Sequence, residues 1–359
     1  MLSSLLRRNG VLGELNLRQA SKAMVIQTRI CRNFGDRDWN LLLEGALVGS
    51  PFQSQTWFKS LEKTFDYQCL YIVASTSGGK IMAALPLMEI RQRWGICRYY
   101  SGLPMGVYGS VIEGMGCNGE IIQAILSRFL ELVNSCVCVG ASLVDYAGNC
   151  STISSYASKT FNRFTHILNL ERPMSEIYDG YDYSIKKNLK KAAREKIKIK
   201  DAETIGEVDA YYDMANEIVL KYKRAPYSRE FFQNIFKIMV PAGEAKFTLA
   251  FREGQPIAGS IQVARCGCVY NWLTASKRQM LEYRAVEAVD DAIIRWAVEQ
   301  RFRVYDFGAS PPEATGLIKF KEKWGCQKRE YKQYEFVGGY KIPAIIKRFK
   351  AALSFSKNE

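Results

Sequence analysis

The chain has 359 residues, of which 48% are hydrophobic and 24% charged, a balance typical of a globular protein with a packed core. Its length suffices for two domains, and no apolar run approaches the roughly 20 residues that a membrane-spanning helix needs. The net charge of +14 is concentrated in residues 1–23, 186–200, 319–332 and 341–359. This distribution predicts local sites for anionic partners rather than a uniformly basic surface.

Residues 1–23 carry four basic side chains and one acidic one, and we interpret them as an N-terminal extension, with a targeting segment as the alternative. Residues 24–165 then alternate apolar strand-like runs with segments of helical periodicity. The predicted strands are 24–30, 68–75, 80–90, 96–101 and 142–146, and the predicted helices are 38–48, 57–65 and 120–134. A glycine-rich loop, 102–109, follows the fourth strand.

The second half, 166–340, contains the same order of elements. The predicted strands are 166–170, 246–252, 257–265, 269–276, 304–307 and 330–337, and the predicted helices are 185–197, 211–222, 229–239 and 285–300. In both halves a strand, a glycine turn, two strands, a helix and a strand follow one another. This structural repeat predicts two copies of one α/β unit. Residues 341–359 are predicted to form a basic amphipathic tail that either docks, is solvated or contacts a membrane surface.

Ten cysteines and one histidine limit the metal and redox chemistry that the sequence supports. The cysteines are irregularly spaced, and the two C-x-C pairs lack the spacing of a zinc site, so we expect free thiols and no metal. With no recognisable secretory signal, this pattern favours a reducing, cytoplasmic location. We expect the single histidine, His166, to lie outside any catalytic cleft.

One late stretch combines a strand end with a cationic helix. Residues 304–308 form a short apolar strand that stops at Gly308, and Pro311-Pro312 can continue neither strand nor helix. Helical spacing resumes after Gly316, with lysines at 319, 321 and 323 beside an apolar stripe that ends at Gly325. This arrangement predicts one wall of a site for an anionic ligand. Lys321 would either contact a phosphate of that ligand or remain solvated.

Several stretches, in order along the chain, resemble one known family. They are Ser50-Pro51-Phe52 with Trp57, Leu85-Pro86-Leu87, Gly102-Leu103-Pro104 with Tyr108-Gly109, 185–192, Ser228-Arg229-Glu230-Phe231-Phe232, Asp306-Phe307-Gly308, and Phe320-Lys321 with Trp324-Gly325. Over residues 25–337 the chain resembles the FemAB-like branch of the GNAT acyltransferases, which carries two GNAT-type domains. The resemblance implies an α/β protein with two tandem GNAT-like domains, 24–165 and 166–340, each a mixed, mainly antiparallel sheet flanked by helices.

The family resemblance also implies an activity. It implies transfer of an acyl or aminoacyl group onto an amino group of an envelope or polysaccharide precursor, such as a peptidoglycan precursor, with the active site in the second domain. The donor is expected to be acyl-CoA, an acyl-carrier thioester or aminoacyl-tRNA, without a tightly bound cofactor. If aminoacyl-tRNA is the donor, tRNA is also a partner. The protein is expected to be cytoplasmic, with peripheral contact at the inner face of the membrane. By position, Lys321 matches the cationic residue near the family's donor site.

The segment before the helix at 285–300 departs from ordinary GNAT enzymes. Those enzymes hold the CoA pyrophosphate on a glycine-rich loop, where backbone N–H groups meet the phosphates. Residues 278–285 contain no glycine here. Either the donor is not CoA, or Arg278 and Arg284 hold its phosphates by their side chains.

Transfer to an amine requires a group that accepts a proton, because an alkyl amine has a pKa near 10. No Ser-His-Asp or Cys-His arrangement is evident, so Asp306, Tyr270 or a substrate phosphate is the predicted acceptor. Asp306 could equally cap the loop after its strand. The predicted catalytic residues are Asp306, Lys321 and Tyr270. The predicted substrate-binding residues are Tyr108, Arg224, Trp272, Arg278, Arg284 and Lys319.

A second hypothesis belongs to another class of protein. The same basic segments, above all 186–200, would suit a non-catalytic protein that binds nucleic acid or anionic lipid. The glycine-free loop and the lack of a catalytic histidine favour this alternative, whereas the stretch from Asp306 to Gly325 favours the transferase.

Overall fold

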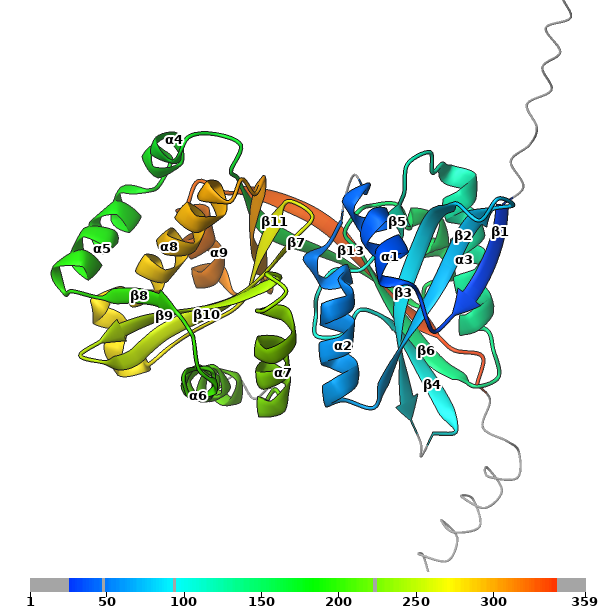
Figure 1. Cartoon of the computed structure of the whole chain (residues 1–359), viewed down its shortest axis with the longest axis horizontal. Coiled ribbons are helices and arrows are strands. Elements are labelled where there is room, and N and C mark those ends of the chain that lie inside the picture. Colours follow the sequence, from blue (N-terminus) through cyan, green and yellow to red (C-terminus); the bar gives the residue numbers. More distant parts are fainter. Residues whose placement is uncertain (1–25, 47–48, 93–94, 222–224, 341–359) are drawn as a thin grey trace, which may run out of the picture.

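One sheet runs through both lobes of the molecule, as Figure 1 shows. The structure is a computed structural model that describes residues 26–46, 49–92, 95–221 and 225–340. Its strands are hydrogen-bonded in the order β1-β2-β3-β4-β6-β13-β7-β12-β11-β10-β9-β8, and β5 pairs with β3 outside this path. Among the described residues only β4 with β6 and β11 with β12 are parallel pairs.

The N-terminal lobe is a sheet with helices on both faces. Its strands are β1 (Ile26–Cys31), β2 (Tyr67–Thr76), β3 (Ile81–Gln92), β4 (Cys97–Gly102), β5 (Ile112–Glu113) and β6 (Cys138–Asp145). α3 (Gly119–Val133) packs on one face, and α1 (Asp36–Glu44) and α2 (Gln55–Thr64) pack on the other. Because both faces are covered, the central residues of β2 and β3 form nearly continuous apolar runs.

The C-terminal lobe has the same layered plan. Its strands are β8 (Lys198–Asp201), β9 (Ala245–Arg252), β10 (Gln255–Arg265), β11 (Cys268–Ser276) and β12 (Val304–Ala309). α6 (Ile205–Lys221) and α7 (Arg229–Met239) cover one face, and α8 (Ala285–Glu299) covers the other. α4 (Met174–Asp179), α5 (Tyr183–Arg194) and α9 (Thr315–Glu322) surround α8, with α5 packed directly on it.

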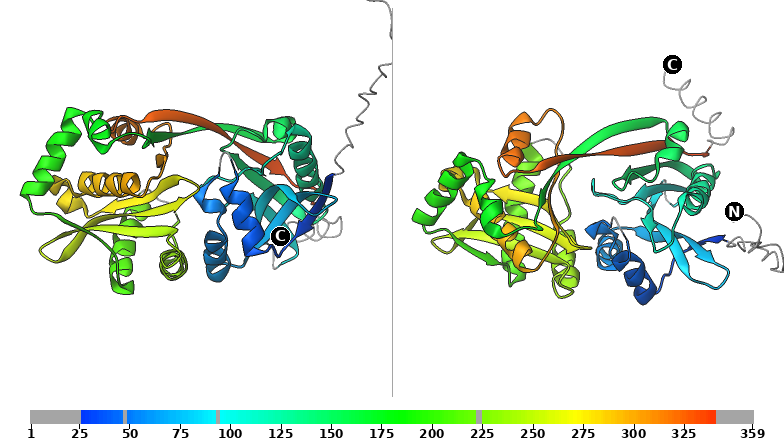
Figure 2. Two further views of the ribbon diagram at one scale, coloured as in Figure 1. Left: turned by 45° about the horizontal axis from the view of Figure 1, so that its top comes forward. Right: turned by 90° about the horizontal axis from the view of Figure 1, so that it is seen from above.

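Two long strands join the lobes. β7 (Lys159–Asn169) pairs with β12 of the C-terminal lobe, and β13 (Gln327–Val337) pairs with β6 of the N-terminal lobe. The two strands also pair with each other from Gln327–Ile167 to Glu335–Lys159. Seen from above, they form a ribbon that spans the molecule (Figure 2). The last strand of the chain therefore completes the sheet of the first lobe.

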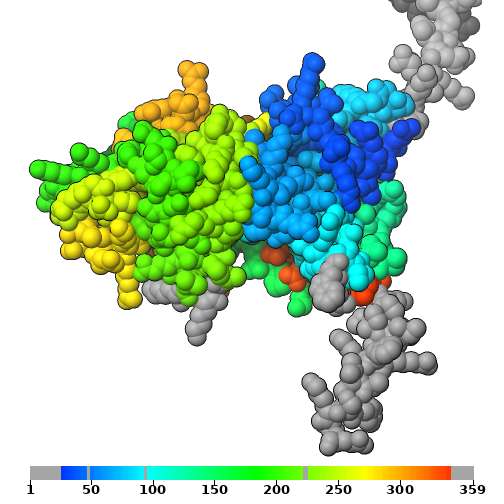
Figure 3. Space-filling view, turned by 60° about the horizontal axis from the view of Figure 1, so that its bottom comes forward, coloured from blue at the N-terminus to red at the C-terminus, as the bar shows by residue number. Residues whose placement is uncertain are grey.

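An aromatic core lies where the lobes meet. Trp57 of α2 makes edge-to-face contacts with Trp272 of β11 and Phe231 of α7, at ring-centroid distances of 5.4 and 5.5 Å. Phe52 contacts Tyr270 in the same way at 4.7 Å. Figure 3 shows the lobes in contact along α2 and α7, and beside that contact a hollow floored by β7 and β13. Buried aromatic pairs of this kind fix the lobes relative to each other.

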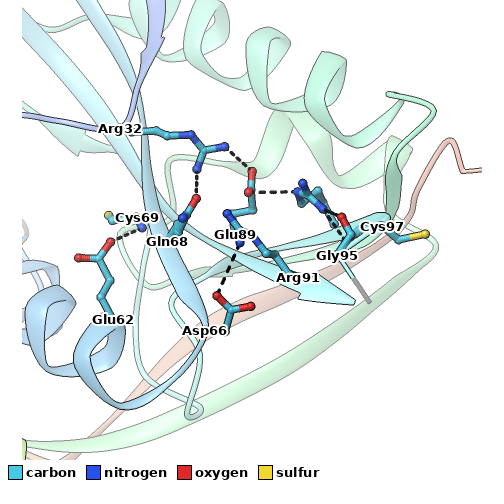
Figure 4. Close-up of polar contacts among 10 residues, drawn as sticks. Arg32, Glu62, Asp66, Gln68, Cys69, Glu89, Arg91, Gly95 and Cys97 are labelled. Atoms are coloured by element: carbon cyan, nitrogen blue, oxygen red, sulfur yellow. Dashed lines mark hydrogen bonds and ion pairs between the residues drawn. The ribbon is translucent and has the colours of Figure 1, made fainter. Parts of the chain in front are cut away.

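A buried carboxylate ties the first strands of the N-terminal lobe together (Figure 4). Glu89 of β3 lies 2.9 Å from Arg32, next to the end of β1, and 3.1 Å from Arg98 of β4. The Glu89 side chain is only 4% exposed, and the two guanidinium groups compensate its charge. This network stabilises the edge of the sheet.

The fold class predicted from the sequence is confirmed, and most elements lie within a few residues of their predicted positions. The sequence did not predict β5, β8, α4 or the full length of β7. The predicted domain boundary between residues 165 and 166 lies inside β7 and remains a prediction. Residues 1–23 and 341–359 lie outside the described residues. Within those described, no helix is both long and apolar enough to cross a membrane.

Candidate active site

The parallel ladder between β11 and β12 is short and then opens. It pairs Cys268 with Val304, Val269 with Tyr305 and Tyr270 with Asp306. Beyond Tyr270, β11 continues to Ser276 beside β10, whereas β12 pairs Ala309 with Thr165 of β7. The two strands therefore separate after Asp306. We call the point of separation the β11–β12 fork.

Gly308 lies at the fork in a conformation that requires glycine. Its φ is +76°, in the region that side chains disfavour. A Cβ there would also lie 3.1 Å from the Tyr270 hydroxyl and 3.2 Å from the Asn271 carbonyl oxygen. The strand end thus packs its backbone directly against β11, which explains the glycine in the Asp-Phe-Gly stretch.

Asp306 accepts hydrogen bonds from both lobes. Its Oδ1 accepts from the Gly308 N–H at 2.8 Å, from the Thr165 hydroxyl, and from the Tyr108 hydroxyl at 3.4 Å. Its Oδ2 accepts from the Tyr146 hydroxyl at 3.2 Å. Tyr108 and Tyr146 come from the N-terminal lobe and stack on each other with ring centroids 4.1 Å apart. Asp306 therefore joins the two lobes through one carboxyl group.

Asp306 is fully buried, which sets what it can do chemically. Burial raises the pKa of its carboxyl, while the hydrogen bonds from Thr165 and Gly308 and the charge of Lys321 oppose that rise. In this conformation the carboxyl holds the strand end through the Gly308 N–H. The catalytic role predicted for it stays a prediction.

Lys321 of α9 is buried beside the same glycine. Its ammonium donates to the Gly308 carbonyl oxygen at 2.6 Å and to the Ala309 carbonyl oxygen at 3.3 Å. Burial lowers the pKa of Lys321 to about 8, although the carboxyls of Asp306 and Asp290 act in the opposite direction. The sequence suggested a phosphate contact or solvation for this lysine. The structure instead places it on backbone carbonyl oxygens.

Together, Asp306 and Lys321 hold the residue Gly308 from its two sides. The carboxyl accepts from the Gly308 N–H, and the ammonium donates to the Gly308 carbonyl oxygen. The two predicted catalytic groups are thus brought to one residue of the fork. Tyr270, the third, contacts Tyr108 edge-to-face at 5.1 Å, and burial raises the pKa of its phenol well above the ordinary value. Tyr270 is therefore neutral around pH 7.

Another buried acid, Asp290, lies on the face of α8 that packs against the sheet. Asp290 accepts from the Asn271 amide at 3.0 Å and from the Tyr305 hydroxyl at 3.4 Å. Burial and the neighbouring carboxyl of Glu287 raise the pKa of Asp290 to about 8. Asn271, which follows Tyr270, thereby points away from the lobe interface and towards α8, as strand alternation predicts.

The first turn of α8 contains an acidic side chain, although no side chain caps the N-terminus of the helix. Glu287, in its first turn, is 7% exposed and accepts a hydrogen bond from Asn188 of α5 at 2.8 Å. Arg278 and Arg284 are exposed, and Arg284 precedes the helix with φ of +57°. An acidic side chain in the first turn partly offsets the positive end of this helix. That arrangement disfavours a pyrophosphate at the α8 N-terminus, and the two arginines remain available to solvent.

The other predicted substrate-binding residues lie in different environments. Trp272 belongs to the aromatic core between the lobes, and Tyr108 is buried against Asp306. Lys319 is exposed on α9. Arg224 lies outside the described residues. Among these residues, only Tyr108 lies next to the predicted catalytic groups. Its side chain is more deeply buried than a loop residue was expected to be.

Two further residues at the site had no signal in the sequence, and a third, His166, was expected to lie outside it. Tyr146 and Thr165 donate to Asp306, but each lies in a strand or at its end without any recognisable motif. His166 of β7 is 1% exposed and its Nδ1 has no hydrogen-bond partner among the described residues. Burial and the nearby charge of Lys321 lower its pKa. His166 is thus buried near Lys321, and its expected place outside a catalytic cleft stays a prediction.

Two cavities lie in the two lobes, and neither is lined by Asp306 or Lys321. One, of about 210 Å³, lies in the N-terminal lobe between β4, β6 and β13. The other, of about 280 Å³, lies between α6, the β9–β10 turn and the residues after β11. Among the described residues, no cluster of three His, Cys, Asp or Glu side chains could hold a metal ion.

Comparisons with known proteins identify the fold. Residues 181–322 match the model of the acetyltransferase (GNAT) domain family, and no curated protein matches the chain. A crystal structure of FemX is similar with a TM-score of 0.69 and 10% identity, over 87% of this chain and 98% of that one. A tandem GNAT protein from the clavulanic acid biosynthesis pathway has a TM-score of 0.56 and 12% identity, over 89% of this chain and 100% of that one.

A third similar structure is the C-terminal domain of a putative lysylphosphatidylglycerol synthetase from Agrobacterium fabrum. It has a TM-score of 0.52 and 11% identity, over 84% of this chain and 93% of that one. The structural likenesses establish a FemAB-like duplicated GNAT fold. With the domain match they support, in general terms, an acyl- or aminoacyltransferase that uses an activated donor and an amine acceptor.

Proposed function

We propose that this tandem GNAT protein transfers an acyl or aminoacyl group from an activated donor to an amino group of an envelope or polysaccharide precursor. The observation that carries the proposal is the buried lysine at the β11–β12 fork. Lys321 is held 2.6 Å from the Gly308 carbonyl oxygen at the point where the two parallel strands separate. A side chain that changes protonation near neutral pH is what transfer to an amine needs at that place.

The proton transfer follows from the two pKa values involved. An acceptor amine of ordinary pKa near 10 is mostly an ammonium at pH 7 and cannot attack a carbonyl group. The neutral fraction of the amine attacks the carbonyl, and the nitrogen of the tetrahedral intermediate, which is far more acidic than the free ammonium, gives its proton to neutral Lys321, whose pKa is about 8. The resulting ammonium then offers positive charge to the oxyanion that develops on the donor carbonyl. To do so, it exchanges its longer contact, with the Ala309 carbonyl oxygen, for the substrate. When the intermediate collapses, the bond to the donor's sulfur or ribose oxygen breaks, and the ammonium returns its proton to that leaving group.

The position of Glu287 bears on the identity of the donor. A CoA pyrophosphate placed at the α8 N-terminus would meet a carboxylate that is already bonded to Asn188. An aminoacyl-tRNA ester or a carrier-protein thioester has no such requirement, so we propose these donors ahead of acyl-CoA. If acyl-CoA is used, Arg278 and Arg284 hold its phosphates from the exposed side of the loop.

The test is a transfer assay read by mass spectrometry of the acceptor. Full-length protein is incubated with acetyl-CoA, an acyl-carrier-protein thioester or a mixture of aminoacyl-tRNAs, each with amino-sugar and peptide-amine acceptors. We expect one donor to add its acyl mass to an acceptor amine. Lys321→Met, which keeps the volume of the side chain, should reduce the rate by about 10²-fold or more. Lys323→Ala, at the exposed end of the same helix, should keep it.

Two results would count against the proposal. Transfer by Lys321→Met at the wild-type rate would remove the lysine from the chemistry. The absence of transfer from every donor, together with salt-sensitive binding of nucleic acid or anionic vesicles, would instead favour the non-catalytic protein.

A further inference from the structure

The N-terminal lobe has a fork of its own, with a cavity in it. β4 and β6 run parallel from Arg98–Cys138 to Gly102–Leu143, as β11 and β12 do in the other lobe. Beyond Gly102 the chain leaves β4 in the loop 103–108. A cavity of about 210 Å³ lies at this point, which we call the N-lobe pocket. It is lined by Ser101, Leu103, Pro104, Met105, Gly106, Ser142, Val144, Tyr331 and Gln333.

The loop that walls the N-lobe pocket has a fixed shape. Leu103 and Met105 have φ of +84° and +71°, which is unfavourable for residues other than glycine. Gly109 returns the chain to the sheet by bridging to Val144, and any Cβ on it would overlap the Gly102 carbonyl oxygen. Backbone strain persists only where the surroundings impose it, and it concentrates at ligand sites. The wall of the pocket is therefore preformed.

The lining of the pocket carries no charged side chain. Its polar side-chain groups are the hydroxyls of Ser101 and Ser142, 3.4 Å apart, the hydroxyl of Tyr331 and the amide of Gln333. The Gln333 oxygen accepts from Arg163 at 3.2 Å, which leaves its N–H₂ group as a donor. A phosphate or carboxylate here would meet no charged side chain in the lining itself, and the adjacent Arg163 guanidinium is already bonded to Gln333. The N-terminal copy of the repeat is therefore unsuited to a phosphate-bearing donor such as CoA.

We propose that the N-lobe pocket binds one neutral sugar residue that bears hydroxyl and amide groups. A sugar ring has a face of C–H groups, which suits the ring of Tyr331 and the side chain of Val144. Its rim of hydroxyls suits the two serines and the free amide of Gln333. The cavity of about 210 Å³ is smaller than the roughly 300–1,000 Å³ of sites for drug-sized ligands, which suits a single ring rather than an extended ligand.

The pocket adjoins the buried groups behind the β11–β12 fork. The ring of Tyr331 contacts Tyr108 edge-to-face at 5.0 Å, and Tyr108 donates to Asp306. The assignment of the sugar to the acceptor molecule rests on the proposed function. The binding of a sugar does not, because it depends on the lining of the pocket alone.

The experiment measures binding without any transfer. Full-length protein is titrated with methyl N-acetyl-β-D-glucosaminide by ligand-observed NMR, with N-acetylalanine methylamide and coenzyme A as comparison probes. Two variants alter the pocket, Gln333→Met and Ser142→Val. Gln279→Met, in the lining of the C-terminal cavity, is the matched control. Thermal unfolding of each variant establishes that it is folded.

We expect the sugar to bind the wild type and the Gln279→Met control equally, and each pocket variant to raise its Kd at least tenfold. Coenzyme A should not displace the sugar. The inference is overturned if the wild type does not bind the sugar, if both pocket variants bind it unchanged, or if the alanine derivative or coenzyme A takes its place. Sugar binding without transfer would contradict only the proposed function. Transfer without sugar binding would contradict only this inference.

Discussion

Lys321 donates its ammonium to the carbonyl oxygen of Gly308 across 2.6 Å, and this contact connects the helix α9 to the end of β12. A buried lysine is uncommon, because an ammonium loses its hydration when it leaves water. Here two backbone carbonyls replace part of that hydration, and the remaining cost appears as a pKa lowered to about 8. The measurable properties of the fork follow from this balance.

The rate of transfer should depend on pH through Lys321. If its neutral amine accepts the proton of the acceptor, kcat/KM rises with pH and levels off above an apparent pKa of about 8. The measurement is a kcat/KM profile between pH 6 and 10, using an acceptor whose own titration is determined separately. In Lys321→Arg, whose guanidinium stays charged throughout this range, the step near pH 8 should disappear. An unchanged step in that variant would assign it to another group.

The stability of the protein should also depend on the charge of Lys321. Its pKa is about 8 when folded and near 10.5 when unfolded, so between these values the unfolded chain binds more protons. The contribution of this lysine to the free energy of unfolding therefore increases as pH rises from about 8 to 10.5, and it is least favourable below pH 8. Urea denaturation at pH 7.5 and 9.5 should show this increase in the wild type relative to Lys321→Met. Parallel pH dependences in the two proteins would contradict it.

Gly308→Ala should destabilise the protein by more than its unfavourable φ alone explains. Gly79→Ala is the matched control, since Gly79 has φ of +83° with nothing within 4 Å of an added Cβ. The control should lose about 1–2 kcal/mol from conformation. At Gly308 the added Cβ also crowds the Tyr270 hydroxyl and the Asn271 carbonyl, which adds about 1–3 kcal/mol. Equal losses in urea denaturation would mean that the fork relaxes freely around the new methyl group.

Tyr146→Phe should weaken the junction between the lobes. The change keeps the stacking on Tyr108 but removes the donor that lies 3.2 Å from Asp306 Oδ2. A buried acceptor left without its partner costs about 1–3 kcal/mol of unfolding free energy. Tyr156→Phe, at a tyrosine that is 65% exposed, should change stability by less than about 0.5 kcal/mol. A Tyr146→Phe protein as stable as this control would show that the hydrogen bond contributes nothing.

The sequence predicted those parts of the fold whose signal is local. α7 was predicted at its observed bounds, and the meander β9–β11 within a few residues, because apolar periodicity and glycine turns mark them within a short window. The pairing of β13 with β6 was not predicted, because it joins residues far apart in the chain and leaves no local pattern. The tandem GNAT class could still be inferred from the repeated order of elements.

The candidate site was predicted in part for the same reason. Asp306 and Lys321 belong to adjacent segments, so their proximity followed from the chain itself. The burial of Lys321 did not, because a lysine within a charged helix is normally solvated. Tyr146 and Thr165 reach Asp306 from other strands, which only the three-dimensional fold reveals. Trp272 was expected to bind substrate, and its place in the core depends on α2 of the other lobe.

The pairing of β13 with β6 has a consequence for synthesis of the protein on the ribosome. Residues 327–337 leave the ribosome after nearly all of both lobes, yet the first lobe needs them to cover the open edge of β6. Until then that edge exposes unpaired backbone groups, which readily pair with other chains. A nascent chain stalled before residue 327 should therefore be prone to aggregate through its earliest-made half.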